Sequence, residues 1–279
     1  MANVMAGRTC LVTGGTSGVG RAIASGLARL GADVLLVSSS VERGSRAAAD
    51  LRRETGGTVE SLTADLSRMD SVRALSVAFR QRRTVLHVLS LNAAVLPMKR
   101  RLTVDGLDSV FATNYLGQFL LTRLLMDLLR KSAPARVITV SGTPGSLRRG
   151  DVRYDDISLE IGWNPLRATL QAAFAKVVFT YELARRLSGT GVTANTFHPG
   201  LVKSNLPRSL PWFLRGPAAL AELLMSTECP TGVYLASAPE VKEVTGAFFV
   251  GRSARRFDPP AAGPDAGKRL WALSEKLAG

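Results

Sequence analysis

The feature that most constrains this chain is a short apolar run, TCLVT at residues 9–13, that leads directly into the glycine-rich stretch TGGTSGVG at residues 13–20. Gly14, Gly18 and Gly20 fit a Gly-x-x-x-Gly-x-Gly turn between a buried strand and a helix. The first two glycines would let the backbone approach a pyrophosphate, and Gly20 would let the helix pack closely on the strand. The first N–H groups of a helix have no partner within it, so they can bind the phosphates. Strand, turn and helix in this order predict a dinucleotide-binding unit.

Apolar runs alternate with helical patterns along the rest of the chain. This alternation is typical of βαβ units and of a parallel sheet that is covered on both faces. A chain of 279 residues with 46% hydrophobic content suits one such domain. We therefore expect a single α/β domain over residues 1–279, a Rossmann-type doubly wound parallel sheet with helices on both faces. The expected strands are 9–13, 33–38, 58–64, 85–93, 136–142, 192–199 and 247–251, and the expected helices are 18–30, 42–54, 68–83, 105–131, 165–188 and 217–228.

Composition and charge exclude several other classes of protein. The net charge is +14, but the basic residues are scattered and no aromatic residues interleave with them, so we expect no nucleic-acid partner. The charge can instead attract an anionic ligand such as a phosphorylated cofactor. No apolar run reaches 18 residues and the N-terminus lacks an apolar signal region, so we expect neither a membrane span nor secretion. Cys10 and Cys229 are interpreted as reduced thiols of a cytoplasmic protein, with no Cys/His spacing for a metal.

The end of the second strand is where dinucleotide-binding proteins choose their cofactor. A carboxylate there would bind the ribose hydroxyls of NAD and repel a 2′-phosphate. This chain has Ser38, Ser39 and Ser40 instead, with Arg43 close by in the sequence. Hydroxyls can bind a phosphate, so NADPH is favoured over NAD as the cofactor. The alternative is that the serines only cap the next helix.

The turns after the other strands complete the expected cofactor site. Asp65 and Leu66 follow the third strand and are placed to meet the adenine, Asn92 and its alanine neighbours follow the fourth strand beside the adenosine ribose, and the PGLV stretch follows the sixth strand beside the nicotinamide. The expected cofactor-binding residues are Gly14, Thr16, Ser17, Gly18, Val19, Gly20, Ser38, Ser39, Ser40, Asp65, Leu66, Asn92, Ala93, Ala94, Pro199, Gly200 and Val202.

Several motifs in order resemble those of the short-chain dehydrogenase/reductase family, and of its retinol-dehydrogenase-like branch. They are TGGTSGVG, LNAA in place of Asn-Asn-Ala-Gly, DGLDSVFATNYLGQFLLTRLL with Asn114, FTYELARRLSGTGVTANTFHPG, and LWALSEKLAG near the C-terminus. The resemblance covers essentially the whole chain. It implies an oxidoreductase with a nicotinamide cofactor and a substrate lid at about 201–228. The substrate contacts expected there are Pro207, Trp212 and Phe213, with Thr169 as a further contact.

The family's chemistry needs a serine, a tyrosine and a lysine, and this chain departs from that set. Measured back from Pro199, the tyrosine and lysine positions of the branch fall on Thr169 and Ala173, and its second serine falls on Gly142. A threonine hydroxyl is far less acidic than a phenol. Only Ser141 and Asn114 remain as contributors to catalysis.

Other residues imitate the missing pair but lie out of register. Tyr181 is three turns too far along the helix, and Tyr154 leaves too little chain between the fifth strand and that helix. Lys176 is one turn beyond the lysine position. We therefore expect these three residues to lie away from the site.

The sequence leaves three functions open. The first is an atypical NADPH-dependent ketoreductase whose substrate stabilises its own oxyanion, which resembles the ketoreductases that act on polycyclic aromatic polyketides of the angucyclinone type in antibiotic biosynthesis. The second is an inactive NADP-binding pseudoenzyme. The third is a non-redox isomerase or cyclase on the same fold, because fold does not settle function.

Overall fold

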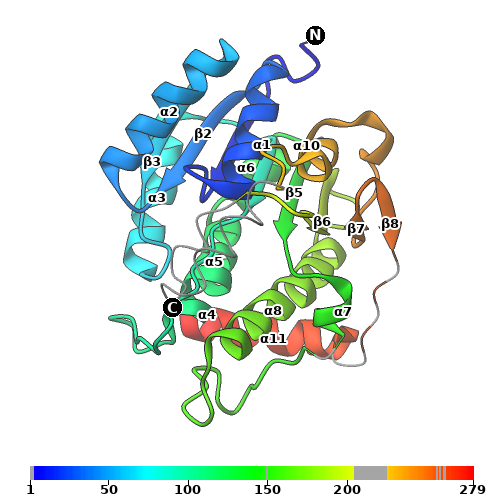
Figure 1. Cartoon of the computed structure of the whole chain (residues 1–279). Coiled ribbons are helices and arrows are strands. Elements are labelled where there is room, and N and C mark those ends of the chain that lie inside the picture. The colour runs from blue at the N-terminus through cyan, green and yellow to red at the C-terminus, as the bar shows by residue number, and fades with distance from the viewer. Residues whose placement is uncertain (1–2, 149, 204–224, 256, 258, 260–261) are drawn as a thin grey trace.

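A computed structural model describes residues 3–148, 150–203, 225–255, 257, 259 and 262–279 (Figure 1). Its centre is an eight-stranded sheet in the order β3-β2-β1-β4-β5-β6-β7-β8. Strands β1 to β7 pair in parallel, and β8 pairs antiparallel with β7. The strands are β1 Thr9–Thr13, β2 Asp33–Ser38, β3 Val59–Thr63, β4 Val88–Leu91, β5 Ala135–Val140, β6 Val192–His198, β7 Phe248–Val250 and β8 Ser253–Arg255. The predicted α/β class with a doubly wound parallel sheet is confirmed.

Helices cover both faces of the sheet, so each strand buries side chains on both sides. Within β1, Leu11 belongs to one hydrophobic core, whereas Cys10 and Val12 belong to the other. The core containing Cys10 is covered by α1 Gly18–Arg29, α2 Val41–Thr55 and α10 Pro230–Ser237. The core containing Leu11 is covered by α3 Met69–Arg82, α5 Gly117–Leu124, α8 Pro165–Arg186 and α11 Pro264–Ala278. The near-continuous apolar strands are those of a sheet buried on both faces.

The long helix α8 is held by aromatic side chains from three other helical segments. Phe179 of α8 lies 5.7 Å, centroid to centroid, from Phe119 of α5 and 6.1 Å from Trp271 of α11. Tyr115 completes the cluster, and its hydroxyl lies 2.7 Å from Ser274 Oγ. Close aromatic pairs of this kind stabilise a core beyond their buried area. The position of α8 along the sheet is therefore set by packing rather than by a loop.

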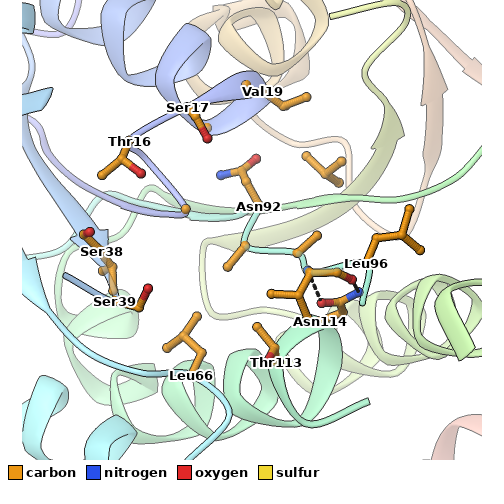
Figure 2. Close-up of a pocket in the computed structure, with 18 of the residues that line it drawn as sticks. Thr16, Ser17, Val19, Ser38, Ser39, Leu66, Asn92, Leu96, Thr113 and Asn114 are labelled. Atoms are coloured by element: carbon orange, nitrogen blue, oxygen red, sulfur yellow. Dashed lines mark hydrogen bonds between the residues drawn. The ribbon is translucent and has the colours of Figure 1, made fainter. Parts of the chain in front are cut away.

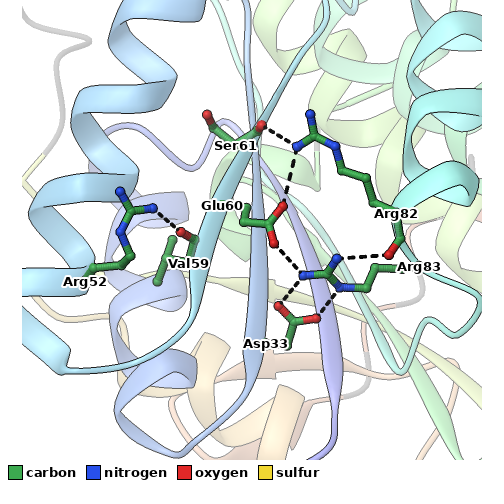
Figure 3. A network of polar contacts seen from close by, with 7 residues as sticks. All are labelled: Asp33, Arg52, Val59, Glu60, Ser61, Arg82 and Arg83. Atoms are coloured by element: carbon green, nitrogen blue, oxygen red, sulfur yellow. Dashed lines mark hydrogen bonds and ion pairs between the residues drawn. The ribbon is translucent and has the colours of Figure 1, made fainter.

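An ion network anchors the end of α3 to the outer strands (Figure 3). Arg83 Nη2 donates to Asp33 Oδ1 of β2 at 2.9 Å and to Glu60 Oε1 of β3 at 2.8 Å. These hydrogen bonds raise the pKa of the Arg83 guanidinium further above its ordinary value. Arg83 thus joins β2, β3 and α3 near the amino ends of the strands, whereas the glycine turn follows the carboxyl end of β1.

Two parts of the fold differ from expectation. The region 105–131, expected as one helix, is divided into α4 Ser109–Phe111, the π-helical turn η1 Ala112–Leu116, α5, and α6 Met126–Lys131. The first of these helices begins only at Ser109, after the N-cap Asp108, whose Oδ1 accepts hydrogen bonds from Val110 N and Phe111 N. The sequence also did not predict α7 Pro144–Leu147, α10, the 3-10 turn η3 Pro239–Val241, or β8. The expected helix at 217–228 falls mostly outside the described residues.

Among the described helices, none combines the length and apolar character needed to cross a membrane.

Candidate active site

A cavity of about 1010 Å³ opens where the carboxyl ends of β1 and β4 meet, the point at which the strand order reverses (Figure 2). In doubly wound sheets this is where ligands bind. The cavity lies at the upper end of the volumes found for small-molecule sites, which suits a dinucleotide together with a substrate. Every residue of the predicted cofactor set except Ser40 lines it. Sequence reasoning did not single out several other lining residues, including Arg21, Arg46, Asp50, Leu96, Pro97, Arg101, Ser109 and Thr113.

The glycine turn has the backbone geometry that its sequence predicts. Gly14 and Gly18 have φ angles of 65° and 56°, in the left-handed region that favours glycine. A Cβ on Gly20 would lie 2.5 Å from the carbonyl oxygen of Gly14, so only glycine allows α1 to pack this closely on β1. The N-cap of α1, Ser17, makes no capping hydrogen bond with its side chain. The first N–H groups of α1 are therefore available to an anion in the cavity.

Serines and arginines line the cavity beyond the end of β2. Ser38 and Ser39 lie there without an acidic residue at the strand end, and Arg43 Nη2 donates to Ser39 Oγ at 3.0 Å. Ser40 is a correction to the predicted set. Its Oγ accepts from Arg43 N at 3.3 Å as the N-cap of α2, so its side chain serves the helix and does not line the cavity.

The turn after β4 forms the opposite wall. Thr13 Oγ1 accepts hydrogen bonds from Asn92 N at 2.9 Å and Ala93 N at 3.2 Å, which fixes this turn against β1. Asn92 Nδ2 donates to Ser90 Oγ, whereas the buried Asn92 Oδ1 has no hydrogen-bond partner among the described residues. A buried acceptor left unpaired costs free energy unless a ligand or water satisfies it. This wall therefore offers an acceptor to a ligand, and together with the glycine turn it fits a dinucleotide.

Asn114 holds the segment that follows this turn. It lies in η1, where its Oδ1 accepts from Val95 N at 2.8 Å and its Nδ2 donates to Val95 O at 3.1 Å (Figure 2). Gln118 adds a hydrogen bond from Nε2 to Ala93 O at 2.8 Å. Isolated π turns are frequent at functional sites. Here the turn brings an asparagine to the cavity wall and commits its amide to the backbone.

The chemical end of the cavity consists of Asn114, Ser141, Gly142, Thr169, Ala173 and Lys176. Ser141 follows β5, and its Oγ donates to Ala173 O at 2.9 Å. Thr169 lies in the first turns of α8, and its Oγ1 donates to Pro165 O at 2.7 Å. Each hydroxyl has one proton, so neither is free to donate to a ligand in this arrangement.

Lys176 lies at this end of the cavity, which corrects the expectation that it is displaced from the site. Its side chain is 5% exposed and lines the cavity. It forms no hydrogen bond or ion pair within the described part of the chain. Burial lowers the pKa of the Lys176 ammonium to about 8. The sequence did carry a signal for this position. Residues 169, 173 and 176 lie at intervals of four and three residues, which places them on one face of a helix.

The other out-of-register residues lie outside the cavity, as expected. Tyr181 donates its hydroxyl to Phe257 O at 2.9 Å, and Tyr154 donates to Ala266 O at 3.2 Å. The predicted lid residues Pro207, Trp212 and Phe213 belong to 204–224, which lies outside the described residues. The residues that flank this segment are joined by a hydrogen bond, which Lys203 N donates to Ser226 O at 2.9 Å.

Comparisons with known proteins agree on one family. Residues 8–152 match the family model described as short chain dehydrogenase. The chain is 36% identical to Retinol dehydrogenase 14 of Homo sapiens over an alignment of 304 residues. That alignment covers 99% of this chain and 88% of that protein. It is 39% identical to Dehydrogenase/reductase SDR family member 13 of Bos taurus over 284 residues, which span 98% of this chain and 74% of that protein.

Two solved structures resemble the fold closely. A crystal structure of a protein from Mycobacterium paratuberculosis matches with a TM-score of 0.77 and 29% identity, over 100% of this chain and 97% of that one. The Pseudomonas aeruginosa RhlG/NADP active-site complex matches with a TM-score of 0.66 and 26% identity, over 88% of this chain and 94% of that one.

Proposed function

The chain belongs to the short chain dehydrogenase family of oxidoreductases, and from that premise we propose that it is an NADPH-dependent ketoreductase without the family's usual tyrosine and lysine. Its substrate is a ketone on a polycyclic aromatic polyketide of the angucyclinone type, formed in antibiotic biosynthesis.

One observation carries this proposal. The resemblance places the family's tyrosine at Thr169 and its lysine at Ala173, and the hydroxyls of Thr169 and Ser141 both donate to backbone carbonyls. The chemical end therefore presents no hydroxyl that is free to donate to a ketone oxygen. Losing the tyrosine acid of the family typically lowers a rate by about 10² to 10⁴. A substrate that stabilises its own oxyanion offsets part of that loss.

A ketone flanked by a phenol meets that requirement. The neighbouring hydroxyl forms an internal hydrogen bond to the ketone oxygen, and this bond strengthens as negative charge develops there, as an oxyanion donor would. The protein then has to orient the reactants in the cavity. Orientation alone is worth about 7 to 11 kcal/mol in favourable cases.

The residues that would hold the cofactor follow the wall of the cavity. The glycine turn and the N-terminus of α1 would bind the pyrophosphate, and Asn92 Oδ1 would accept a hydrogen bond from the nucleoside beside it. Ser39, Arg43 and Arg46 would bind a 2′-phosphate, which favours NADPH over NAD. When bound, the reduced nicotinamide supplies the hydride.

NADPH oxidation with a panel of ketones tests this proposal. We expect turnover of polycyclic ketones that carry a neighbouring phenol, and none of simple aliphatic ketones. Turnover of aliphatic ketones would contradict substrate assistance. Tight NADPH binding with no turnover of any ketone would favour the pseudoenzyme, and a rearranged product with no NADPH consumed would favour the isomerase or cyclase.

A further inference from the structure

The most unusual group in the cavity is the ammonium of Lys176. It is buried at the chemical end and has no hydrogen-bond or ion-pair partner among the residues that the structure describes. Burying a charge without a partner is unfavourable, so a protein retains such a group when a ligand uses it. We propose that Lys176 is the general acid of this site, and that its ammonium gives a proton to the ketone oxygen as that oxygen accepts negative charge. The inference rests on the reductase function proposed above.

Helix geometry places Lys176 suitably for this role. Thr169, Ala173 and Lys176 lie on one face of α8, at intervals of four and three residues. Side chains on a helix lean toward its N-terminus and cover the preceding turn. We therefore expect the Lys176 side chain to lean toward the turn that carries Ala173, whose small side chain leaves room for it. Lys176 lines the same cavity as Ala173 and Thr169, the positions where the resemblance places the absent catalytic groups.

The hydrogen bonds at the chemical end leave Lys176 as the donor. The Ser141 and Thr169 hydroxyls donate to backbone carbonyls, and the Asn114 amide is held by both backbone groups of Val95. Gly142 has no side chain that could donate. An ammonium has three N–H donors and no acceptor. Of the six described residues that form this end, Lys176 is the one whose side-chain donors have no partner.

Among the residues that the structure describes, no carboxylate forms an ion pair with Lys176. Burial is the sole cause that lowers its pKa, to about 8, which is in the range of lysines that act as acids near neutral pH. On β6, burial lowers the pKa of His198, which disfavours the charged imidazolium. On η1, the Tyr115 hydroxyl lies against Ser274, and on β5 Arg136 donates to two backbone carbonyls. The charged residues of α11 are all exposed: Asp265, Lys268, Arg269, Glu275 and Lys276.

The proton transfer balances with the hydride that a bound, reduced nicotinamide dinucleotide would supply. That hydride would form the new C–H bond at the carbonyl carbon, and the π electrons of the C=O bond would move to oxygen. The neighbouring phenol stabilises that charge through its hydrogen bond. The Lys176 N–H bond breaks and its proton forms the O–H bond of the alcohol. The neutral amine then takes a proton from water that enters as the product leaves.

The test compares wild type with Lys176→Met, Lys176→Arg and Lys131→Met, the last being an exposed lysine on α6. With a phenol-flanked polycyclic ketone and saturating NADPH, we expect Lys176→Met to lower kcat about 10²-fold. The Kd for NADPH, measured by quenching of protein fluorescence, should stay within about threefold of wild type. Lys131→Met should match wild type in both.

The pH profile separates an acid from a structural residue. Wild-type kcat should fall about tenfold per pH unit above a pH near 8, because the ammonium loses its proton there. Lys176→Arg, which also serves if the methionine variant fails to fold, should lose this decline because a guanidinium stays protonated.

An unchanged kcat and pH profile in the Lys176 variants would overturn the inference alone. A weaker NADPH Kd with unchanged kcat would place the ammonium on the cofactor and also overturn it. A wild type that reduces no ketone would overturn the proposed function itself.

Discussion

Replacing Lys176 by methionine should make the protein more stable at neutral pH. Burial lowers the pKa of this ammonium from 10.5 to about 8, and the side chain has no partner among the described residues to offset the loss of hydration. At about 1.36 kcal/mol per pH unit, this difference between the two pKa values corresponds to a penalty of about 3 kcal/mol on the folded state at pH 7. Methionine is similar in length and apolar, so it should fill the same space without that penalty.

The same two pKa values, 10.5 and about 8, give the direction in which stability changes with pH. Below a pH of about 8 the lysine is protonated in both the folded and the unfolded state, and the folded state bears the whole penalty. Between about 8 and 10.5 the folded protein holds fewer protons than the unfolded chain, so wild-type stability rises with pH. The advantage of Lys176→Met should therefore be largest near pH 7 and should shrink as the pH approaches 10.5.

Urea denaturation at pH 7 and pH 10 measures both effects. We expect a higher midpoint for Lys176→Met at pH 7, with an unchanged m-value, and a much smaller difference at pH 10. The exposed control Lys131→Met should change the free energy of unfolding by no more than about 0.5 kcal/mol. A Lys176→Met variant that is less stable than wild type, by the same amount at both pH values, would refute the reasoning, because it would show that the ammonium has a stabilising partner.

Three further substitutions test other parts of the site. Thr169→Ala should keep kcat/KM within about tenfold of wild type, because its hydroxyl donates to the backbone; a loss above about 10³-fold would make that hydroxyl the acid. Gly20→Ala should abolish measurable NADPH binding and lower Tm, because its Cβ would lie 2.5 Å from Gly14 O, whereas Gly145→Ala, with open space around the new methyl group, should alter neither. Ser39→Asp should weaken NADPH binding at least about tenfold, or about 1.4 kcal/mol, without weakening NADH binding, and equal losses for both cofactors would contradict a 2′-phosphate site there.

The glycine-turn end of the cavity was predictable because local sequence dictates it. The strand, the glycine turn and the helix are consecutive in the chain, and the φ angles of Gly14 and Gly18 follow from that motif alone. Ser40 shows the limit of such reasoning. A serine just before a helix can line a cavity or cap the helix, and only the observed hydrogen bond from Arg43 N decides for the cap.

The chemical end was less predictable because it depends on side-chain reach between neighbouring turns. Spacing along the helix places Lys176 one turn from the family's lysine position, which suggested that it lies away from the site. That Lys176 lines the cavity and has no partner among the described residues was visible only in three dimensions. Likewise the π turn that carries Asn114 was hidden in a continuous helical pattern over 105–131.

The central claim is that the substrate stabilises its own oxyanion in a site where the Ser141 and Thr169 hydroxyls donate to the backbone. Single-turnover reduction by the NADPH-loaded protein tests it most directly, with a phenol-flanked polycyclic ketone and the methyl ether of the same ketone. The ether keeps the shape of the ring system but removes the internal hydrogen bond. We expect the hydride-transfer rate to fall by at least about 10²-fold for the ether, with similar ligand affinity. Equal rates for the two ketones would contradict the account.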